Sequence, residues 1–300
     1  NGTVRKATLN DLSGDVLGRV FDVLIRGKFE NKGGMGIYLT PRQVTEAAVD
    51  MVMHDLKKTP GKIIKLNKNG VPEFKVLDGC CGSGGFLIKM LEDLKQYLLI
   101  ELAGDRRQWE ERFEMMKEHS IVGADNSPGM ILKARINMAL HGANKAQIFK
   151  TENSLTSPQL KPETFDVILT NPPFKSGGIN EKSTEGKATL QHFRNDIEDG
   201  TNKMKSIGLS LGCKPDSKGK WKPVNSMDPA VLFIDRYLQL LKPGGLCMMV
   251  VPDGVLSNAG DRYVREYLMG KKNDVTGDFE GGKAILKAVI SLPQETFSLS

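Results

Sequence analysis

An asparagine followed by two prolines and a phenylalanine, at positions 171 to 174, is the group of residues with the clearest chemical potential in this sequence. The side-chain oxygen of Asn171 and the carbonyl oxygen of Pro172 are two acceptors on a stiff turn, because each proline fixes φ and lacks an N–H. Together they can accept both hydrogens of a planar amino group, which raises electron density on its nitrogen. Phe174 offers an aromatic face to the ring that carries this amino group. Asn-Pro is also a common turn opening, and Phe174 could instead fill the core, so the motif in isolation allows both interpretations.

The six residues before this motif, Phe165 to Thr170, are an apolar and β-branched run that is typical of a buried parallel strand. Pro172 and Pro173 end the strand, since neither can donate a ladder hydrogen bond. Open α/β sheets bind their ligands at the carboxyl ends of the strands. The sequence therefore predicts that residues 171 to 174 lie at the ligand-binding edge of a sheet.

A glycine-rich stretch from Asp78 to Phe86 follows a predicted strand over residues 75 to 77. Small residues let a backbone turn sharply and approach a ligand closely at a strand-to-helix junction. The stretch has neither the dinucleotide spacing G-x-G-x-x-G nor the Lys-Ser/Thr of a phosphate loop. Asp78 would repel a phosphate, so the stretch favours a cationic or hydrogen-bond-donating ligand.

Two further stretches could complete a ligand site. Asp125 ends a predicted strand over residues 121 to 125, where an acid can accept hydrogen bonds from two ribose hydroxyls. Thr40, Pro41 and Gln43 predict a helix start, with Thr40 as N-cap, Pro41 at the first helical position and Gln43 completing a capping box. This helix is expected to reach about residue 57, and its positively polarised start either holds a carboxylate or is an ordinary cap.

The remaining pattern alternates strands and helices, which predicts an α/β fold with a doubly wound, mostly parallel sheet. Residues 1–36 are expected to form a short N-terminal helical segment, with a helix over 15–26, and residues 37–300 a catalytic domain. An insertion at about 175–227 is too long for a simple connection. The other predicted helices cover 86–102, 106–118, 128–141, 229–241 and 261–269, and the other predicted strands cover 147–150, 246–251 and 286–292.

Composition excludes several classes of protein. A hydrophobic content of 39% in 300 residues is sufficient for a core and argues against wholesale disorder. Neither a long apolar run nor a signal pattern is present, which predicts a soluble, cytoplasmic protein. The four cysteines fit no metal or disulfide framework, and no metal is expected. The chain begins with Asn1 rather than Met, so we expect a piece of a longer protein.

The formal net charge of +6 is mild, but six lysines and a single acid lie between residues 203 and 222. A solvated loop and a loop that meets a phosphate backbone are both consistent with this run.

Five motifs in order resemble the modification (methyltransferase) subunit of type I restriction–modification systems, in the N6-adenine DNA methylase family. They are Thr-Pro at a helix start, D-x-x-x-G-S-G-G-F at 78–86, an acid ending the second strand, N-P-P-F at 171–174 and L-K-P-G-G at 241–245. The resemblance covers about residues 15 to 297. It implies the Rossmann-like fold of AdoMet-dependent methyltransferases and methyl transfer from S-adenosyl-L-methionine (AdoMet) to the amino group of a flipped adenine in double-stranded DNA. It also implies two partners, a specificity subunit and a restriction (nuclease) subunit.

The resemblance assigns roles to individual residues. Asn171, Pro172 and Phe174, with Pro173 in the same turn, would bind the target base and form the catalytic group. Asp78 would face the ammonium of AdoMet and Asp125 its ribose. The residues implied to contact AdoMet are Tyr38, Thr40, Pro41, Asp78, Gly82, Gly84, Asp125, Asn126, Asn153 and Ser154.

The sequence departs from the family pattern at three positions. Gly79 stands where the family usually has proline, Asp125 is shorter than the common glutamate, and Asn153 replaces a frequent acid. The third departure leaves the contact with the adenine of AdoMet open. Three alternatives also remain open: an amino-methyltransferase acting on protein glutamine or RNA, one acting on cytosine in DNA, and an AdoMet-binding subunit without catalysis of its own.

Overall fold

The computed structural model describes residues 40–59, 61–174, 177–194 and 209–297. The predicted helix over residues 15–26, the whole segment 1–36 and the candidate Tyr38 lie outside the described residues. By its internal contacts the chain divides into two compact units, residues 1–152 with 295–300 and residues 153–294, and each is described by itself.

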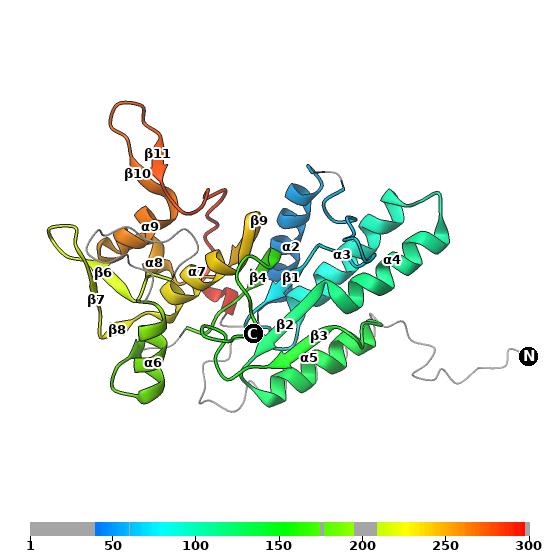
Figure 1. Ribbon diagram of the computed structural model, residues 1–300, viewed down its shortest axis with the longest axis horizontal. Coiled ribbons are helices and arrows are strands. Elements are labelled where there is room, and N and C mark those ends of the chain that lie inside the picture. The colour runs from blue at the N-terminus through cyan, green and yellow to red at the C-terminus, as the bar shows by residue number, and fades with distance from the viewer. Residues whose placement is uncertain (1–39, 60, 175–176, 195–208, 298–300) are drawn as a thin grey trace, which may run out of the picture. The chain divides into compact units, whose positions relative to one another are not determined.

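The principal sheet has five strands in the order β3-β2-β1-β4-β9 (Figure 1). Strand β1 pairs in parallel with β2, β2 in parallel with β3, and β4 in parallel with β9. An order that begins 3-2-1-4 is that of doubly wound α/β folds. The predicted α/β fold class with a parallel sheet is therefore confirmed.

The first unit alternates helices and strands. Its elements are α2 (Arg42–Leu56), β1 (Val76–Asp78), α3 (Gly85–Glu101), α4 (Arg106–His119), β2 (Ile121–Asp125), α5 (Pro128–Leu140) and β3 (Gln147–Lys150). Strands β2 and β3 have the predicted bounds, and β1 is shifted by one residue. The ends of the helices lie within one or two residues of the predicted ends.

Helix α3 buries one apolar face. Leu87, Leu91, Leu94 and Leu98 recur at helical spacing, and each is 2% exposed or less. Gly123 on β2 allows close approach, since a Cβ there would lie 2.8 Å from side-chain carbons of Leu87 and Ile148. The apolar face of α3 can therefore pack closely against β2, because Gly123 has no side chain at the contact.

The start of α2 differs from the prediction. The N-cap is Pro41, not Thr40, and no side chain caps the helix, so the expected capping box with Gln43 is wrong. Pro41 has the extended backbone of an N-cap residue (φ −56°, ψ 142°), and its carbonyl oxygen accepts hydrogen bonds from the backbone N–H and the hydroxyl of Thr45. The Thr45 hydroxyl donates to a carbonyl oxygen, whereas an N-cap side chain accepts a backbone N–H, so Thr45 does not take over the capping role that was expected of Thr40.

The second unit contains a larger number of short elements. They are β4 (Phe165–Thr170), β5 (Ile179–Asn180), α6 (Thr184–His192), β6 (Cys213–Pro215), β7 (Trp221–Pro223), β8 (Ser226–Met227), α7 (Pro229–Leu240), β9 (Leu241–Met249), α8 (Asp253–Ser257), η2 (Ala259–Asp261), α9 (Arg262–Met269), β10 (Gly270–Lys272) and β11 (Phe279–Gly281), and η3 (Gln294–Phe297) follows them. Elements β5 to β8 with α6 occupy the predicted insertion, where β5 pairs with β8 and β6 with β7.

Strand β4 is the core of this unit, and all six of its residues are buried. Asp166, the charged member, forms an ion pair of 2.6 Å with Lys242 at the start of β9. Asp228 caps α7 by accepting the backbone N–H of Ala230, and Pro229 takes the first helical position. The predicted strand over 165–170 and the predicted cap of α7 are confirmed.

Two predictions for the second unit are wrong. The L-K-P-G-G turn was expected to separate α7 from a strand over 246–251, but β9 begins at Leu241 directly after the helix and ends at Met249. The register of β9 against β4 shifts between Phe165 and Val167, which accommodates the turn residues inside the strand. Residues 286–292 are not a strand, because their apolar side chains, such as Ile290 at 52% exposure, have no sheet face to cover.

None of the helices in the described part of the chain combines the length and the apolar character that crossing a membrane requires.

Candidate functional site

The glycine loop, residues 78–85, connects β1 to α3 and is held by hydrogen bonds from its own backbone. Asp78 is only 2% exposed and accepts the backbone N–H of Cys80 at 3.1 Å. The N–H of Cys81 donates to the carbonyl oxygen of Ala124 at 2.9 Å, and the N–H of Gly84 donates to that of Cys81 at 2.7 Å. The loop is therefore a folded cradle beside the end of β2.

Two glycines in this loop have backbone conformations that other residues rarely adopt. Gly82 has φ +52° and Gly84 has φ +90°. A Cβ on Gly84 would lie 3.7 Å from the nearest atom, the Cβ of Ala134, which is an ordinary contact distance. Glycine is needed at this position for its backbone conformation, not for lack of space.

Asp125 links the end of β2 to the glycine loop. One oxygen of its carboxylate accepts the N–H of Gly82 at 3.0 Å, and the other accepts the N–H of Ser127 at 2.8 Å. Each oxygen keeps a second lone pair, so the carboxylate can still accept hydroxyl hydrogens from a ligand. Asn126, the next residue, is exposed. The structure thus brings Asp78, Gly82, Gly84, Asp125 and Asn126 together, and their contact with AdoMet stays a prediction.

The pKa of the Cys81 thiol reflects its burial and the negative charge around the loop. Burial raises the pKa of Cys81 well above its ordinary value, and the carboxylates of Asp78 and Asp125 raise it further. The thiol therefore stays protonated at neutral pH and is no nucleophile. The same two carboxylates make the loop favourable for a cation and unfavourable for a phosphate.

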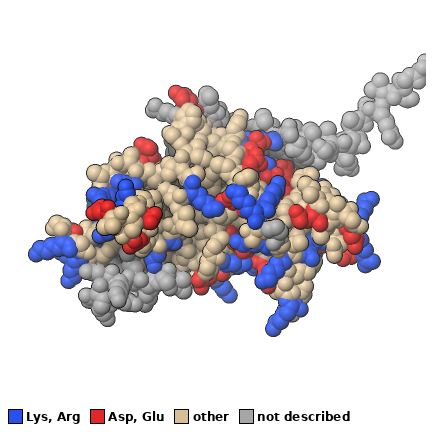
Figure 2. Space-filling view, turned by 90° about the horizontal axis from the view of Figure 1, so that it is seen from above, with Lys and Arg blue, Asp and Glu red and all other residues tan. Residues whose placement is uncertain are grey.

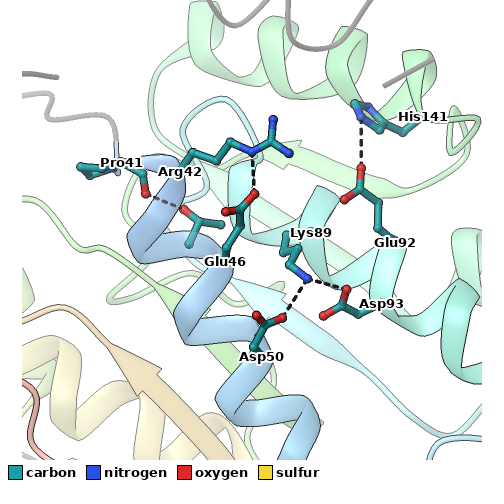
Figure 3. A network of polar contacts seen from close by, with 9 residues as sticks. Pro41, Arg42, Glu46, Asp50, Lys89, Glu92, Asp93 and His141 are labelled. Carbon is teal, nitrogen blue, oxygen red and sulfur yellow. Dashed lines mark hydrogen bonds and ion pairs between the residues drawn. The ribbon is translucent and has the colours of Figure 1, made fainter. Parts of the chain in front are cut away.

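Helix α2 is attached to α3 close to this loop (Figure 3). Lys89 on α3 bridges Asp50 on α2, at 2.9 Å, and Asp93 on its own helix, at 2.6 Å. Farther along α3, Glu92 lies 3.6 Å from the ring of His141, the C-cap residue of α5. These polar contacts join three helices of the first unit. Pro41 is the N-cap of the first of them, and Thr40 precedes it.

Asn137 is a positioning residue of the loop that the sequence analysis missed. It lies on the buried face of α5, at 1% exposure, and its side-chain N–H donates to the carbonyl oxygen of Ser83 at 3.0 Å. The available signal was a polar residue at a helix position that otherwise carries apolar side chains, such as Ala134 and Met138.

In the second unit the Asn-Pro-Pro-Phe turn follows β4 directly. Thr170, the last strand residue, is fully buried; its hydroxyl lies 3.4 Å from that of Tyr237, and its carbonyl oxygen accepts the N–H of Val250. Asn171 is half-buried with its side-chain oxygen fully enclosed, and Phe174 is half-buried. Pro172 is buried and Pro173 is exposed, so the turn is anchored on one side and open on the other.

Asn153 and Ser154 also belong to the second unit. The side chain of Asn153 donates to the hydroxyl of Thr189 at 3.1 Å and accepts the N–H of Leu155 at 3.0 Å, so it stabilises a turn. Ser154 is buried, at 8% exposure. Their proposed contact with AdoMet stays a prediction.

Comparison with known proteins places this geometry in a family. Residues 12–206, well over half of the chain, match the model of the N-6 DNA Methylase family. The chain is 29% identical over 173 residues to the type II methyltransferase M.MamI of Microbacterium ammoniaphilum, covering 56% of this chain and 42% of that protein. It is 23% identical over 270 residues to the type I restriction enzyme EcoEI methylase subunit of Escherichia coli, covering 87% of this chain and 43% of that protein.

Solved structures agree on the fold. A modification subunit of a putative type I restriction enzyme from Vibrio vulnificus YJ016 superposes with a TM-score of 0.53 at 22% identity, over 89% of this chain and 44% of the other. The chain spans less than half the length of the first relatives that it matches. Its sequence motifs, its sheet order and the match over residues 12–206 agree, and the chain belongs to the N-6 DNA methylase family.

Proposed function

We propose that the chain is the catalytic part of a restriction–modification methylase and transfers a methyl group from AdoMet to the N6 amino group of adenine in DNA. The observation that carries this proposal is the Asn-Pro-Pro-Phe turn at the end of the fully buried strand β4, in a member of the N-6 DNA methylase family. Two acceptors beside an aromatic ring are what recognition of an aromatic amine requires.

The glycine loop fits AdoMet better than it fits a nucleotide phosphate. AdoMet carries positive charge on its ammonium and sulfonium groups, and the loop combines the buried carboxylate of Asp78 with that of Asp125. Two ribose hydroxyls can donate to the remaining lone pairs of Asp125. Gly82 and Gly84 leave the backbone bare of side chains, so that a ligand can approach it closely. When bound, AdoMet supplies a methyl group activated by the positive sulfur.

The turn would orient the amine. Adenine within a duplex cannot present its amino group, so the base must leave the stack. Asn171 and Pro172 accept the two amino hydrogens and direct the nitrogen lone pair outward, while Phe174 stacks on the base. AdoMet held by the glycine loop and Asp125 would supply the methyl group, and the amino nitrogen held by Asn171 and Pro172 would accept it and release one proton to solvent. Positioning and fixed dipoles supply the rate, and no histidine is required as a base.

The type I assignment is part of this proposal. Alignments with type I methylase subunits extend over 86–87% of the chain for the Escherichia coli EcoEI and Salmonella potsdam StySPI proteins. The type II relative M.MamI is more similar, at 29% identity, but over only 56% of the chain. We favour a type I modification subunit that acts with a specificity subunit and a nuclease subunit. A type II methyltransferase is the second candidate.

The test is to incubate the purified chain and AdoMet with adenine-unmethylated DNA, with and without a specificity subunit, and to quantify modified nucleosides by mass spectrometry. Calorimetry on the same sample measures AdoMet binding. 6-Methyladenine that appears only with the specificity subunit supports the type I proposal, and 6-methyladenine from the chain alone favours the type II candidate.

Other outcomes would contradict the proposal. Methylated cytosine, or methyl transfer to RNA or protein glutamine in parallel assays, would assign another substrate to the same turn. AdoMet binding without methyl transfer in any mixture would indicate a non-catalytic subunit.

A further inference from the structure

The hairpin formed by β6 and β7, with the turn between them, is a rigid element within the second unit (Figure 1). The N–H of Asp216 donates to the carbonyl oxygen of Lys220, and the N–H of Gly219 donates to that of Asp216, both at 2.9 Å. The carboxylate of Asp216 also accepts the backbone N–H groups of Lys218 and Lys220, at 2.9 and 3.0 Å. Gly219, with φ +76°, allows the chain to reverse. The turn is therefore held in one conformation before any ligand arrives.

The strands of the hairpin contact α9 next to the turn. The ring of Trp221 meets that of Tyr263 edge-on, with centroids 6.0 Å apart. The ammonium of Lys214 lies 4.9 Å from the centre of the same Tyr263 ring, and the Tyr263 hydroxyl contacts the sulfur of Met227 at 3.3 Å. The hairpin is thus a firm support for the side chains at its tip.

Two positively charged side chains of the hairpin face each other across its two strands, which lowers the stability of the hairpin. Lys214 stands directly opposite Lys222 in the antiparallel pair, and like charges at such positions are destabilising. The β10–β11 hairpin of the same unit follows the opposite rule, because Lys271 stands opposite Glu280. The β10–β11 hairpin thus has a stabilising pair of opposite charges, whereas the β6–β7 hairpin has a destabilising pair of like charges. Locally unfavourable choices of this kind are commonly found at functional sites.

The lysines differ in how far their charge is balanced. Lys222 forms an ion pair of 2.9 Å with Asp216. Lys214 borders a cavity of about 440 Å³ that Asp228 and Asp261 also line, so acids lie near it. Lys218 and Lys220 are exposed at the tip, and no acidic side chain among the described residues forms an ion pair with either. Figure 2 shows basic side chains at the left edge of the view, which is the edge that the hairpin occupies in Figure 1.

The edges of the hairpin are unsuited to pairing with another strand. Pro215 and Pro223 end its two strands and have no N–H to donate. A partner that adds a strand is therefore disfavoured, whereas a partner that offers negative charge to the exposed tip is favoured. An array of phosphates is such a partner.

From these observations we propose that the β6–β7 hairpin is a phosphate-contacting element for duplex DNA, in which Lys218 and Lys220 neutralise backbone phosphates. The inference rests on the proposed function, because it takes DNA as the substrate. The contacts would carry no sequence information. Their role is to hold the duplex while the target base enters the Asn-Pro-Pro-Phe turn.

The test is the double variant Lys218→Gln/Lys220→Gln of the chain, compared with the unmodified chain in binding a fluorescent DNA duplex over a series of salt concentrations. Each lost phosphate contact reduces the slope of log K against log[salt] by about 0.9, so the double variant should lose about 1.8. The matched control is Lys271→Gln/Lys272→Gln on β10, which removes the same charge from exposed positions of the same unit. It should leave the slope unchanged, and a charge-preserving Lys218→Arg/Lys220→Arg variant should restore it.

An unchanged slope in the tip variant, an equal loss in the control, or absence of salt-dependent duplex binding by the unmodified chain would overturn the inference. A loss of slope for a single-stranded RNA of equal length but not for the duplex would do the same. Methyl transfer measured on the same samples separates this failure from that of the proposed function. If the unmodified chain methylates adenine but Lys218→Gln/Lys220→Gln leaves the slope of log K against log[salt] unchanged, only the proposed role of the hairpin is refuted. If the tip variant loses slope while the unmodified chain methylates no adenine even with a specificity subunit present, the hairpin inference holds and the proposed function does not.

Discussion

The glycine loop of the first unit and the Asn-Pro-Pro-Phe turn of the second both follow buried strands, but they are held in different ways. The loop is shaped by backbone N–H groups that donate to the carboxylate of its own Asp78 and to that of Asp125 at the end of β2. The turn is shaped by its two prolines and by the buried strand β4 beneath it. Its candidate reactive group, the amide of Asn171, is a side chain.

Because of this difference, we expect mutations in the loop and in the turn to have different effects on stability and on function. In the loop, Asp125 both maintains the shape and offers acceptors to a ligand, so structure and binding should fail together. In the turn, the side chain of Asn171 can be removed while the prolines keep the backbone in place. Chemistry and stability should therefore separate in the second unit and remain coupled in the first.

The largest expected effect is that of Asn171→Ala on methyl transfer. Removal of one positioned hydrogen-bonding group lowers the turnover number of an enzyme by up to about 10³-fold, and we expect a fall of about that size here. The unfolding temperature and the AdoMet dissociation constant should stay unchanged, as measured by thermal unfolding and calorimetry. Asn225→Ala, at an exposed position of the same unit, is the matched control and should keep full activity. A variant of Asn171 that retains more than a tenth of the activity would refute the proposed mechanism.

The second expected effect is a dependence of stability on pH that originates at Asp235 in α7. Burial raises the pKa of Asp235 from 3.8 to about 6, against the hydrogen bonds from Tyr267 and from the backbone of Ser210 and Leu211 that favour its charged form. Because the folded state holds the proton more tightly, this contribution to stability is complete below about pH 3.8 and is lost as the pH rises through about 6.

With 1.36 kcal/mol per pKa unit, the loss attributable to Asp235 amounts to at most about 3 kcal/mol. Denaturant unfolding at several pH values from 4 to 7 measures it, and Asp235→Asn should flatten the curve over this range. Asp274→Asn, which changes an exposed acid of the same unit, should leave the curve as it is. If Asp235→Asn has the same pH profile as the unmodified chain, the carboxyl of Asp235 is not the group that titrates.

Sequence reasoning placed the strands β1 to β4 and the two candidate loops well, because their signals are local. The run from Phe165 to Thr170 is apolar and ends at two prolines, so both its burial and its last residue could be predicted. The same holds for β2, which ends at Asp125. In both strands the apolar pattern stops at polar or proline residues of a turn, and the prediction and the structure agree.

The contacts that hold the site could not be predicted, because they join residues that are distant in sequence. Gly82 and Asp125 are joined by a hydrogen bond, as are Ser83 and Asn137, and no pattern within either stretch specifies its partner. The cap at Pro41 failed for a different reason. Thr40 is a residue type that favours the N-cap, but the N-cap is the next residue, Pro41, whose side chain has no acceptor for a backbone N–H.

The third expected effect is that of Asp125→Ala, which should reduce AdoMet affinity and stability together. The variant loses the acceptors of the N–H groups of Gly82 and Ser127, and hydrogen bonds to charged groups contribute about 1.5–3 kcal/mol each. We expect AdoMet affinity to fall about 10²-fold by calorimetry, with a lower unfolding temperature. Asp105→Ala removes a carboxylate that accepts a single N–H at the start of α4, and it should lower stability without any effect on AdoMet. Unchanged AdoMet affinity in Asp125→Ala would show that Asp125 serves the fold alone.

The smallest expected effect is that of Gly84→Ala, and it tests whether backbone conformation or space limits the glycine loop. With φ +90° the new side chain imposes a strain of about 1–2 kcal/mol, although the nearest neighbour, the Cβ of Ala134, is 3.7 Å away. Gly104→Ala, which has open space and no such φ, is the control, and it should be close to neutral in thermal unfolding. Because the strain acts on the backbone that shapes the cradle, AdoMet affinity should fall with stability in Gly84→Ala. A stable variant with normal affinity would show that the loop tolerates a side chain there, and that its shape depends on the carboxylates more than on its glycines.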